Sequence, residues 1–194
     1  VAMRLWSDGK RVITVRYHKL MTTRDILAQL IVHSDGPTSA AQLYVRLIGR
    51  LIDRMAGTVT SYDETLDEIE SGLNIANATE TRRRLSELRQ SIVLLRRYMS
   101  PQREALNNMM TEPPSWVDEA CRLQLRETAD KLMRYVEELD AARERSMVIK
   151  DDIANQLAES TNKTLYVLAI VSAIFLPLAF LTGLLGINIG GMPG

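Results

Sequence analysis

The sequence has little of what holds small disulfide-rich or zinc-binding domains together. Cys121 is the single cysteine among 194 residues, so no disulfide framework can form within one chain, and a reducing cytosol is the natural compartment. The other soft metal ligands, His18 and His33, lack the spacing of a tetrahedral zinc site. We therefore expect no dedicated metal-ligand site built from one chain and no bound cofactor.

Motifs of enzymes and of nucleic-acid-binding proteins are missing as well. The sequence has no phosphate-cradling glycine loop, nucleophile elbow or paired-carboxylate motif. Lys plus Arg and Asp plus Glu number 24 each, and a formal net charge of zero disfavours a polyanionic partner. We expect neither enzymatic activity nor nucleic-acid binding, and we interpret the run Arg82 to Arg84 as a solvated helix surface.

Charge is absent from the C-terminal end of the chain. The last 31 residues, 164–194, contain no Asp, Glu, Lys, Arg or His, whereas every earlier segment is charged. As a helix rising roughly 1.5 Å per residue, residues 165–187 can cross a hydrocarbon core of about 30 Å. This run follows a long polar region, which excludes a secretory signal. We predict a transmembrane helix over residues 164–188.

This predicted span has features that a simple membrane anchor does not need. Pro177 lies in mid-span, where it removes one helical hydrogen bond. Glycines crowd the far end around Asn188, whose neutral amide can donate and accept hydrogen bonds. Several such amides in a ring could hold the water shell of a cation without burying a charge. These features favour a pore mouth over an anchor.

The run from Ile174 to Gly183, followed by Gly186-Ile187-Asn188 and Met192-Pro193, resembles the first transmembrane helix and signature loop of the CorA-like metal-ion transporters, the two-transmembrane GxN family. The resemblance implies a homopentamer in the inner (cytoplasmic) membrane, multi-pass in the full-length protein, with a cytosolic N-terminal domain. This helix would line the pore, and the loop would form the outer selectivity mouth for hydrated divalent cations.

The loop also bears on which ion is carried. Magnesium-transporting members usually read Gly-Met-Asn and then Met-Pro-Glu, whereas this chain has Ile187 in the middle and Gly194 at the acidic position. This pattern is similar to the zinc-transporting branch of the family, so the resemblance implies Zn²⁺ as the transported ion. The alternatives are a magnesium, cobalt or nickel channel of the same family and, from another class, a tail-anchored helical tether.

One face of the helix around residues 151–188 is the candidate pore lining. Stepping by three and four residues places on it Asp151, Asn155, Asn162, Leu165, Leu168 or Ala169, Ser172, Leu176, Ala179 and Gly183. The leucines could form constrictions that gate by dewetting, and Asn162 could add a second amide ring. The alternative is that the leucines face a second transmembrane helix or lipid. By resemblance, Asn162, Leu165, Leu168 and Asn188 match family pore positions, and Asp151 matches an acidic cytosolic mouth.

The first 37 residues indicate the end of a cytosolic α/β domain. Met3–Trp6 and Arg11–Tyr17 predict two strands joined by an Asp-Gly turn, and a short helix follows from Thr22 or Thr23 to about His33. A hairpin alone is marginally stable, so we expect further strands upstream in a longer protein. Ser39 with Gln42 suits a helix capping box.

Residues 38–163 predict a cytosolic stalk of three long helices. They cover about Ser39–Ala76, Thr79–Met110 with a bend at Pro101, and a third helix from near Ser115 that enters the membrane unbroken, roughly 100 Å long. Its predicted seam consists of Leu125, Ala129, Leu132, Val136, Leu139, Met147, Ile153 and Leu157. We expect the acidic segment 63–70 to face the arginine-rich second helix. The fold class is therefore mainly α with a small α/β remnant, and residues 189–194 begin the extracytoplasmic loop.

Overall fold

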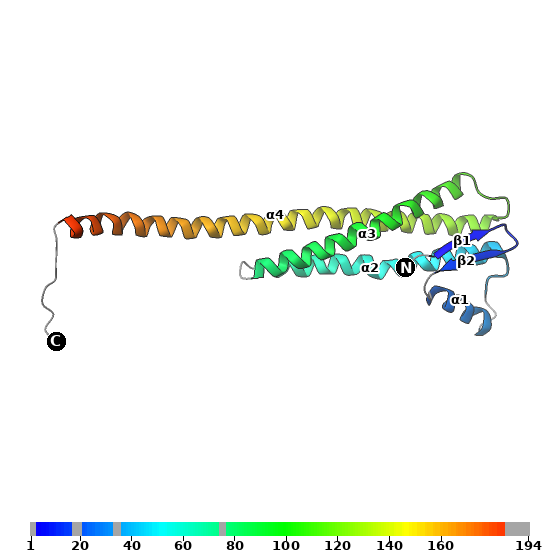
Figure 1. The fold of residues 1–194 in the computed structure, drawn as a ribbon. Helices are drawn as coiled ribbons and strands as arrows, with labels where there is room; N and C mark the ends of the chain where they lie inside the picture. Colours follow the sequence, from blue (N-terminus) through cyan, green and yellow to red (C-terminus); the bar gives the residue numbers. More distant parts are fainter. Residues whose placement is uncertain (1–2, 17–20, 33–35, 74–76, 185–194) are drawn as a thin grey trace.

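The computed structural model describes residues 3–16, 21–32, 36–73 and 77–184. The elements are β1 (Met3–Ser7), β2 (Val12–Arg16), α1 (Met21–Val32), α2 (Ala40–Ser71), α3 (Ala78–Thr111) and α4 (Glu119–Leu184). The helices α2 and α3 pack along the first part of α4, the hairpin and α1 lie at one end, and the rest of α4 extends alone (Figure 1). The predicted mainly α fold with a small α/β remnant is confirmed.

The β-hairpin forms where the sequence predicted it. Its strands are antiparallel, with Met3 opposite Arg16 and Ser7 opposite Val12. In the turn, the Asp8 carboxylate accepts hydrogen bonds from the backbone N–H groups of Arg11 and Lys10 at 2.8 and 2.9 Å, which lowers the pKa of Asp8. Gly9 adopts a φ of 86°, and a Cβ at this position would lie 2.4 Å from Cβ of Trp116. Only glycine therefore fits both the turn and its contact with the loop before α4.

The capping box at the start of α2 is present, but its second hydrogen bond goes to the residue before the cap and not to the cap itself. The Ser39 hydroxyl accepts a hydrogen bond from the Gln42 N–H at 3.1 Å, as predicted. The Gln42 side chain reaches back to the N–H of Thr38 at 2.9 Å, one residue before the cap. At the other end, α2 stops at Ser71, where the Gly72 N–H bonds to the Glu68 carbonyl. The predicted extension of this helix to Ala76 is wrong at residues 72 and 73, and residues 74–76 lie outside the described part.

The long C-terminal helix begins four residues later than predicted. Ser115 belongs to a turn closed by a bond from the Val117 N–H to the Pro114 carbonyl at 3.0 Å. Asp118 then caps α4, because its carboxylate accepts from the Cys121 N–H at 2.8 Å, and this bond lowers the pKa of Asp118. From Glu119 the helix continues through Pro177 to Leu184. Its 66 residues confirm one unbroken helix of about 100 Å.

The core is a seam between helices with a seven-residue repeat. On α4 the residues at this spacing are nearly inaccessible to solvent, and they are Leu125, Leu132, Leu139, Ser146 and Ile153. They pack with an equivalent row on α3, which consists of Leu85, Ile92, Met99 and Leu106. A strict seven-residue repeat keeps the contacting faces of long helices in register.

The predicted seam of α4 needs a correction at Met147. The prediction that Met147 lies in the seam is wrong, because this side chain is 39% exposed while Ser146 and Ile149 face the core. The buried Ser146 hydroxyl donates to the Arg143 carbonyl at 2.6 Å, so the polar group is satisfied. On α2, Val45 and Ile52 occupy the core, and the neighbouring Tyr44 and Leu51 are partly buried.

The charged side chains join α2 and α3 mainly to α4 and less to each other. Arg145 of α4 binds Asp63 at 3.3 Å, Asp67 at 2.6 Å and also Glu70, all on α2. Arg96 of α3 forms a two-pronged pair with Asp140 of α4. Within the described residues, Arg84 to Glu68 at 3.3 Å is the single ion pair from α3 to α2. The expected facing of acidic and basic helices is corrected, since α4 provides the main partner of both.

The seam predicts a large effect for one substitution. Leu132→Asp places an unpaired carboxylate at a fully buried position, which should cost about 3 kcal/mol or more of folding stability. The control is Leu123→Asp on the same helix, where the parent side chain is 70% exposed. Thermal melting of the membrane-extracted protein should show a large loss for Leu132→Asp alone. Equal melting of both variants would contradict the assigned seam.

The Arg145 cluster predicts a smaller, salt-dependent effect. Arg145→Gln leaves three carboxylates of α2 without their shared cation, and because the groups are partly solvated we expect a loss of about 1 kcal/mol. The loss should shrink as salt screens the carboxylates. Arg83→Gln is the matched control, since Arg83 pairs within α3 with Glu80 and Glu87. Thermal melting of both variants at low and high salt measures their losses of stability. A loss for Arg145→Gln that does not depend on salt, or that equals the loss for Arg83→Gln, would refute the role of the cluster.

Candidate pore face of α4

One side of α4 is left free by the bundle. Arg145 points toward α2 and Asp140 toward α3, which places the two neighbouring helices around the buried seam. Between the buried Ile149 and Ile153, the side chain of Asp151 is exposed, and so is that of Asn155. The packing of the helical bundle therefore leaves the predicted pore face at these two positions open to solvent.

The same face continues into the apolar segment in two rows. One row repeats every seven residues through Asp151, Ala158, Leu165, Ser172 and Ala179, and the other through Asn155, Asn162, Ala169, Leu176 and Gly183. The helix is unbroken between the first and last residues of both rows. The orientation of α4 about its own axis in the bundle therefore determines which way these residues face in the apolar segment. Leu168 lies beside these rows, one residue before Ala169. The unbroken helix is consistent with one stripe formed by these two rows, with Leu168 at its margin, and the pore role of these residues stays a prediction.

Beyond the bundle, every side of α4 is exposed in a single chain. Leu176 on the predicted pore face is 73% exposed, and Phe175 beside it is 65% exposed. Among the described helices, α4 contains the one segment long and apolar enough to cross a membrane. A stretch that is apolar on all sides requires lipid or other helices around it.

Several polar groups near and within the apolar segment are satisfied by the helix itself. Glu159 pairs with Lys163 at 2.9 Å, which lowers the pKa of Glu159, and Lys163 is the last charged residue. The hydroxyls of Thr164 and Thr182 donate to carbonyls four residues earlier, at 3.1 and 3.0 Å. Sequence reasoning missed these bonds, although their four-residue spacing is readable. Ser172 differs, since its hydroxyl has no hydrogen-bond partner within the described residues.

The glycines and the amide of the predicted selectivity loop are described only in part. Gly186, Ile187 and Asn188 lie outside the described residues. Gly183 is described, and a Cβ built there would meet no atom within 4 Å. The packing of one chain therefore does not require glycine at this position. Space for a neighbouring helix or loop is a remaining reason for it.

The described part of the chain contains no group of three His, Cys, Asp or Glu side chains that could hold a metal ion. Cys121 is buried, and burial raises the pKa of its thiol to about 11, with Asp118 adding to the shift. A thiol in this state is a poor metal ligand near neutral pH, because metals bind the thiolate.

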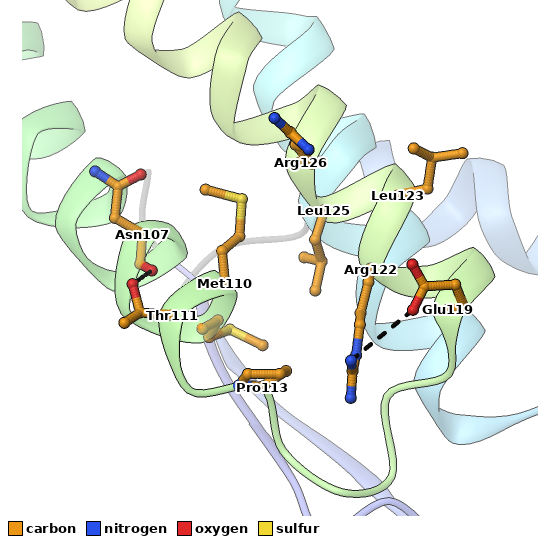
Figure 2. Close-up of a pocket in the computed structure, with 10 residues that line it drawn as sticks. Asn107, Met110, Thr111, Pro113, Glu119, Arg122, Leu123, Leu125 and Arg126 are labelled. Atoms are coloured by element: carbon orange, nitrogen blue, oxygen red, sulfur yellow. Dashed lines mark hydrogen bonds and ion pairs between the residues drawn. The ribbon is translucent and has the colours of Figure 1, made fainter.

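A hollow of about 660 Å³ lies between the end of α3 and the start of α4 (Figure 2). Some of its polar groups pair with close neighbours in their own helices. Arg122 contacts Glu119 at 3.8 Å, and the Thr111 hydroxyl bonds to the Asn107 carbonyl. Because no set of unpaired polar groups converges on the hollow, we assign no site to it.

Similar proteins of known identity include zinc transporters. The chain is 32% identical over all 194 residues to the zinc transport protein ZntB of Pectobacterium atrosepticum, and 29% identical to that of Yersinia enterocolitica. In both cases it covers 59% of the relative's length. The chain therefore spans a little over half the length of these relatives.

Solved structures have the same architecture. The full-length CmaX protein superposes with a TM-score of 0.86 at 33% identity, over 99% of this chain and 59% of that one. The CorA magnesium transporter of Methanocaldococcus jannaschii superposes at 0.81 with 14% identity, over 97% of this chain and 61% of that one, which shows a shared fold.

The family model described as CorA-like Mg2+ transporter protein matches residues 1–194. That match covers the full chain, from the hairpin through the apolar part of α4. The chain belongs to the CorA-like Mg2+ transporter protein family.

Proposed function

We propose that the protein carries divalent cations across the cytoplasmic membrane, through an oligomeric pore lined by α4 and the loop after it. The single observation that carries the proposal is the continuity of α4. One rigid helix joins a packed cytosolic bundle to the apolar segment, and one stripe of small, polar and leucine side chains runs along both. Membership of a family of cation transporters supports the same reading.

The helix alone cannot enclose a water path, so several copies are required. With copies arranged around an axis, the stripe from Asp151 to Gly183 lines the lumen. By family resemblance the assembly is a homopentamer. Asp151 and Asn155 then stand at the cytosolic mouth, and Asn162 forms an amide ring near the membrane boundary. Carboxylate and amide oxygens suit the water shell of a cation.

The apolar part of the stripe provides the barrier. Leu165, Leu168 and Leu176 narrow the path and close it by dewetting when the rings approach each other. Ser172 lies between them with no hydrogen-bond partner within the described residues. A hydroxyl facing lipid in this state is costly, whereas water in a lumen can satisfy it. A lumen-facing hydroxyl can bond to water, so Ser172 is compatible with a lumen on this face.

We propose zinc as the transported ion. The support is the loop sequence Gly186-Ile187-Asn188 with Gly194 at the position of the usual acid, together with relatives named as zinc transport proteins. Magnesium, cobalt or nickel is the second candidate, because the family description names Mg²⁺. The tether alternative is disfavoured, since a tether requires neither family membership nor the stripe. As a transporter, the protein has a substrate ion and no catalytic residues.

The proposal predicts that Asn188→Leu abolishes zinc uptake while assembly is retained. The amide exchanges hydrogen bonds with ion-bound water, and a leucine of similar volume cannot. Asn188→Asp should bind cations more tightly and release them more slowly, because flux requires a site that the ion can leave. Zinc uptake into vesicles containing the full-length protein, with and without a pH gradient, measures both effects.

The matched control is Asn108→Leu, the same change on the exposed surface of α3. It should transport at the parental rate with equal protein incorporation. Parental uptake by Asn188→Leu would contradict the role of the loop. Uptake of magnesium, cobalt or nickel by the parent in place of zinc would contradict the proposed ion and favour the second candidate.

A further inference from the structure

The edge of α3 next to α4 carries a row of arginines that one chain leaves largely unpaired. Arg82, Arg89, Arg96 and Arg103 follow each other every seven residues and so share one edge of the helix. Arg96 pairs with Asp140 of α4, which shows that this edge borders α4. Among the described carboxylates, none lies in ion-pair range of Arg82 or Arg89.

Apolar side chains are exposed next to this row. Val93 and Leu94 are 44% and 48% exposed, and they line a shallow hollow of about 400 Å³ together with Arg89 and Arg97. Arg97 lies over the ring of Tyr98, 5.5 Å from its centre. Exposed aliphatic and aromatic side chains interleaved with arginine are typical of protein–protein contacts. We call this surface, from Arg82 to Arg97, the α3 flank.

The exposed surface of α2 has the opposite character. Glu64 is exposed, and none of the basic groups in the described part is within ion-pair range of it. Gly57 is exposed too, and a Cβ built on it would meet nothing within 4 Å, while Thr60 and Ser61 are small and exposed. This α2 flank, residues 57–64, is a flat strip that ends in a free carboxylate.

The two flanks lie at the same height along the bundle. The ion pair between Arg84 and Glu68 fixes the level of α3 against α2, which runs antiparallel to it. Counting residues from this pair places Arg89 level with Asp63, one residue from Glu64. The same count places Val93 and Leu94 level with the strip from Gly57 to Thr60. An arginine of the α3 flank is thus nearly level with a carboxylate of the α2 flank, and the exposed Val93 and Leu94 are level with its small side chains.

The flanks also lie on opposite sides of the pore face of α4. The pairing of Asp140 places α3 on one side, and the pairing of Arg145 places α2 on the other. Rotation of a copy about a pore axis that runs parallel to α4 along this face does not change the position of any residue along that axis. A ring of copies around the lumen therefore sets the α3 flank of one copy beside the α2 flank of the next.

We propose that the occupant of the α3 flank is the α2 flank of a second copy of this chain, with Arg89 bound to Glu64 of that copy and Val93 and Leu94 packed over its Gly57. This proposal rests on the oligomeric pore proposed above. The contact joins two different surfaces, so it is heterologous and closes into a ring. Exposed ion pairs contribute little individually, so the charges set partner choice and register while the apolar pair supplies burial.

A second copy fits better than a membrane surface. The acidic segment 63–70 lies at the level of the first arginines and would be repelled by anionic lipid headgroups. The same segment attracts the arginines of a neighbouring copy. Opposite charges on the two flanks of one chain are the complementarity that a heterologous ring uses.

The test is cross-linking between differently tagged full-length chains in one membrane. One chain carries Thr60→Cys and the other Gln90→Cys, so a mixed product joins two copies. Cys121 is buried and is present in every chain, so any reaction at this thiol is the same for the test pair and the control pair. The control replaces Gln90→Cys by Gln102→Cys, which is also exposed but about 18 Å further along α3. We expect a mixed dimer for the first pair only.

The native mass of the parent protein distinguishes failure of this interface from failure of the oligomeric pore. An oligomer that gives no mixed dimer, or gives it equally for both pairs, overturns this interface and leaves the pore standing. A monomeric mass overturns the proposed pore and the interface together.

Charge reversal gives a second measurement that does not depend on cysteine. Arg89→Glu should shift the native mass from oligomer toward monomer, and adding Glu64→Arg in the same chain should restore the oligomer. Loss of assembly without restoration in the double variant, or no loss at all in Arg89→Glu, would overturn the pairing.

Discussion

The seven-residue seam of α4 is the constraint on which the rest of the structure depends. Leu125, Leu132, Leu139 and Ile153 are buried against α2 and α3, and they fix the rotation of α4 about its own axis. Because the helix then continues unbroken to Leu184, the same rotation determines which side chains face which way in the apolar segment. Packing in the helical bundle thus determines the direction of the candidate pore face.

Charge placement reinforces this arrangement. Arg145 and Asp140 lie at the margins of the seam and bind α2 and α3, respectively. Each pair is partly solvated and contributes little stability alone, but together they hold the two helices on one side of α4. The other side carries Asp151 and Asn155 free of intrachain contacts with the bundle core. The same asymmetry leaves α2 and α3 with flanks of opposite charge.

Long-range apolar periodicity made the helices predictable, whereas local hydrogen bonds decided where the observed helix ends and seam positions differ from the predicted ones. The seam of α4 follows from apolar spacing, and Met147 was misplaced because Ser146, whose hydroxyl is hydrogen-bonded, takes the core position. The start of α4 was missed because Asp118 caps it, a signal that the preceding prolines obscured. The basic partner of the acidic segment depends on three-dimensional packing. Sequence order suggested the arginines of α3 as that partner, whereas in the structure Arg145 of α4 binds the segment. The pore face follows from periodicity, but its role remains a proposal, as does that of the Gly186–Asn188 loop.

The most direct test of the account is thiol accessibility along the apolar part of α4. Single cysteines from residue 165 to 183 in the full-length protein are exposed to a small water-soluble thiol reagent in membranes. The account predicts labelling at positions 165, 168, 172, 176, 179 and 183, with protection at intervening positions such as 166, 170 and 174, because one face lines water. Labelling on a different face, or uniform protection of all positions, would contradict the claim that bundle packing directs this face of α4 into a pore.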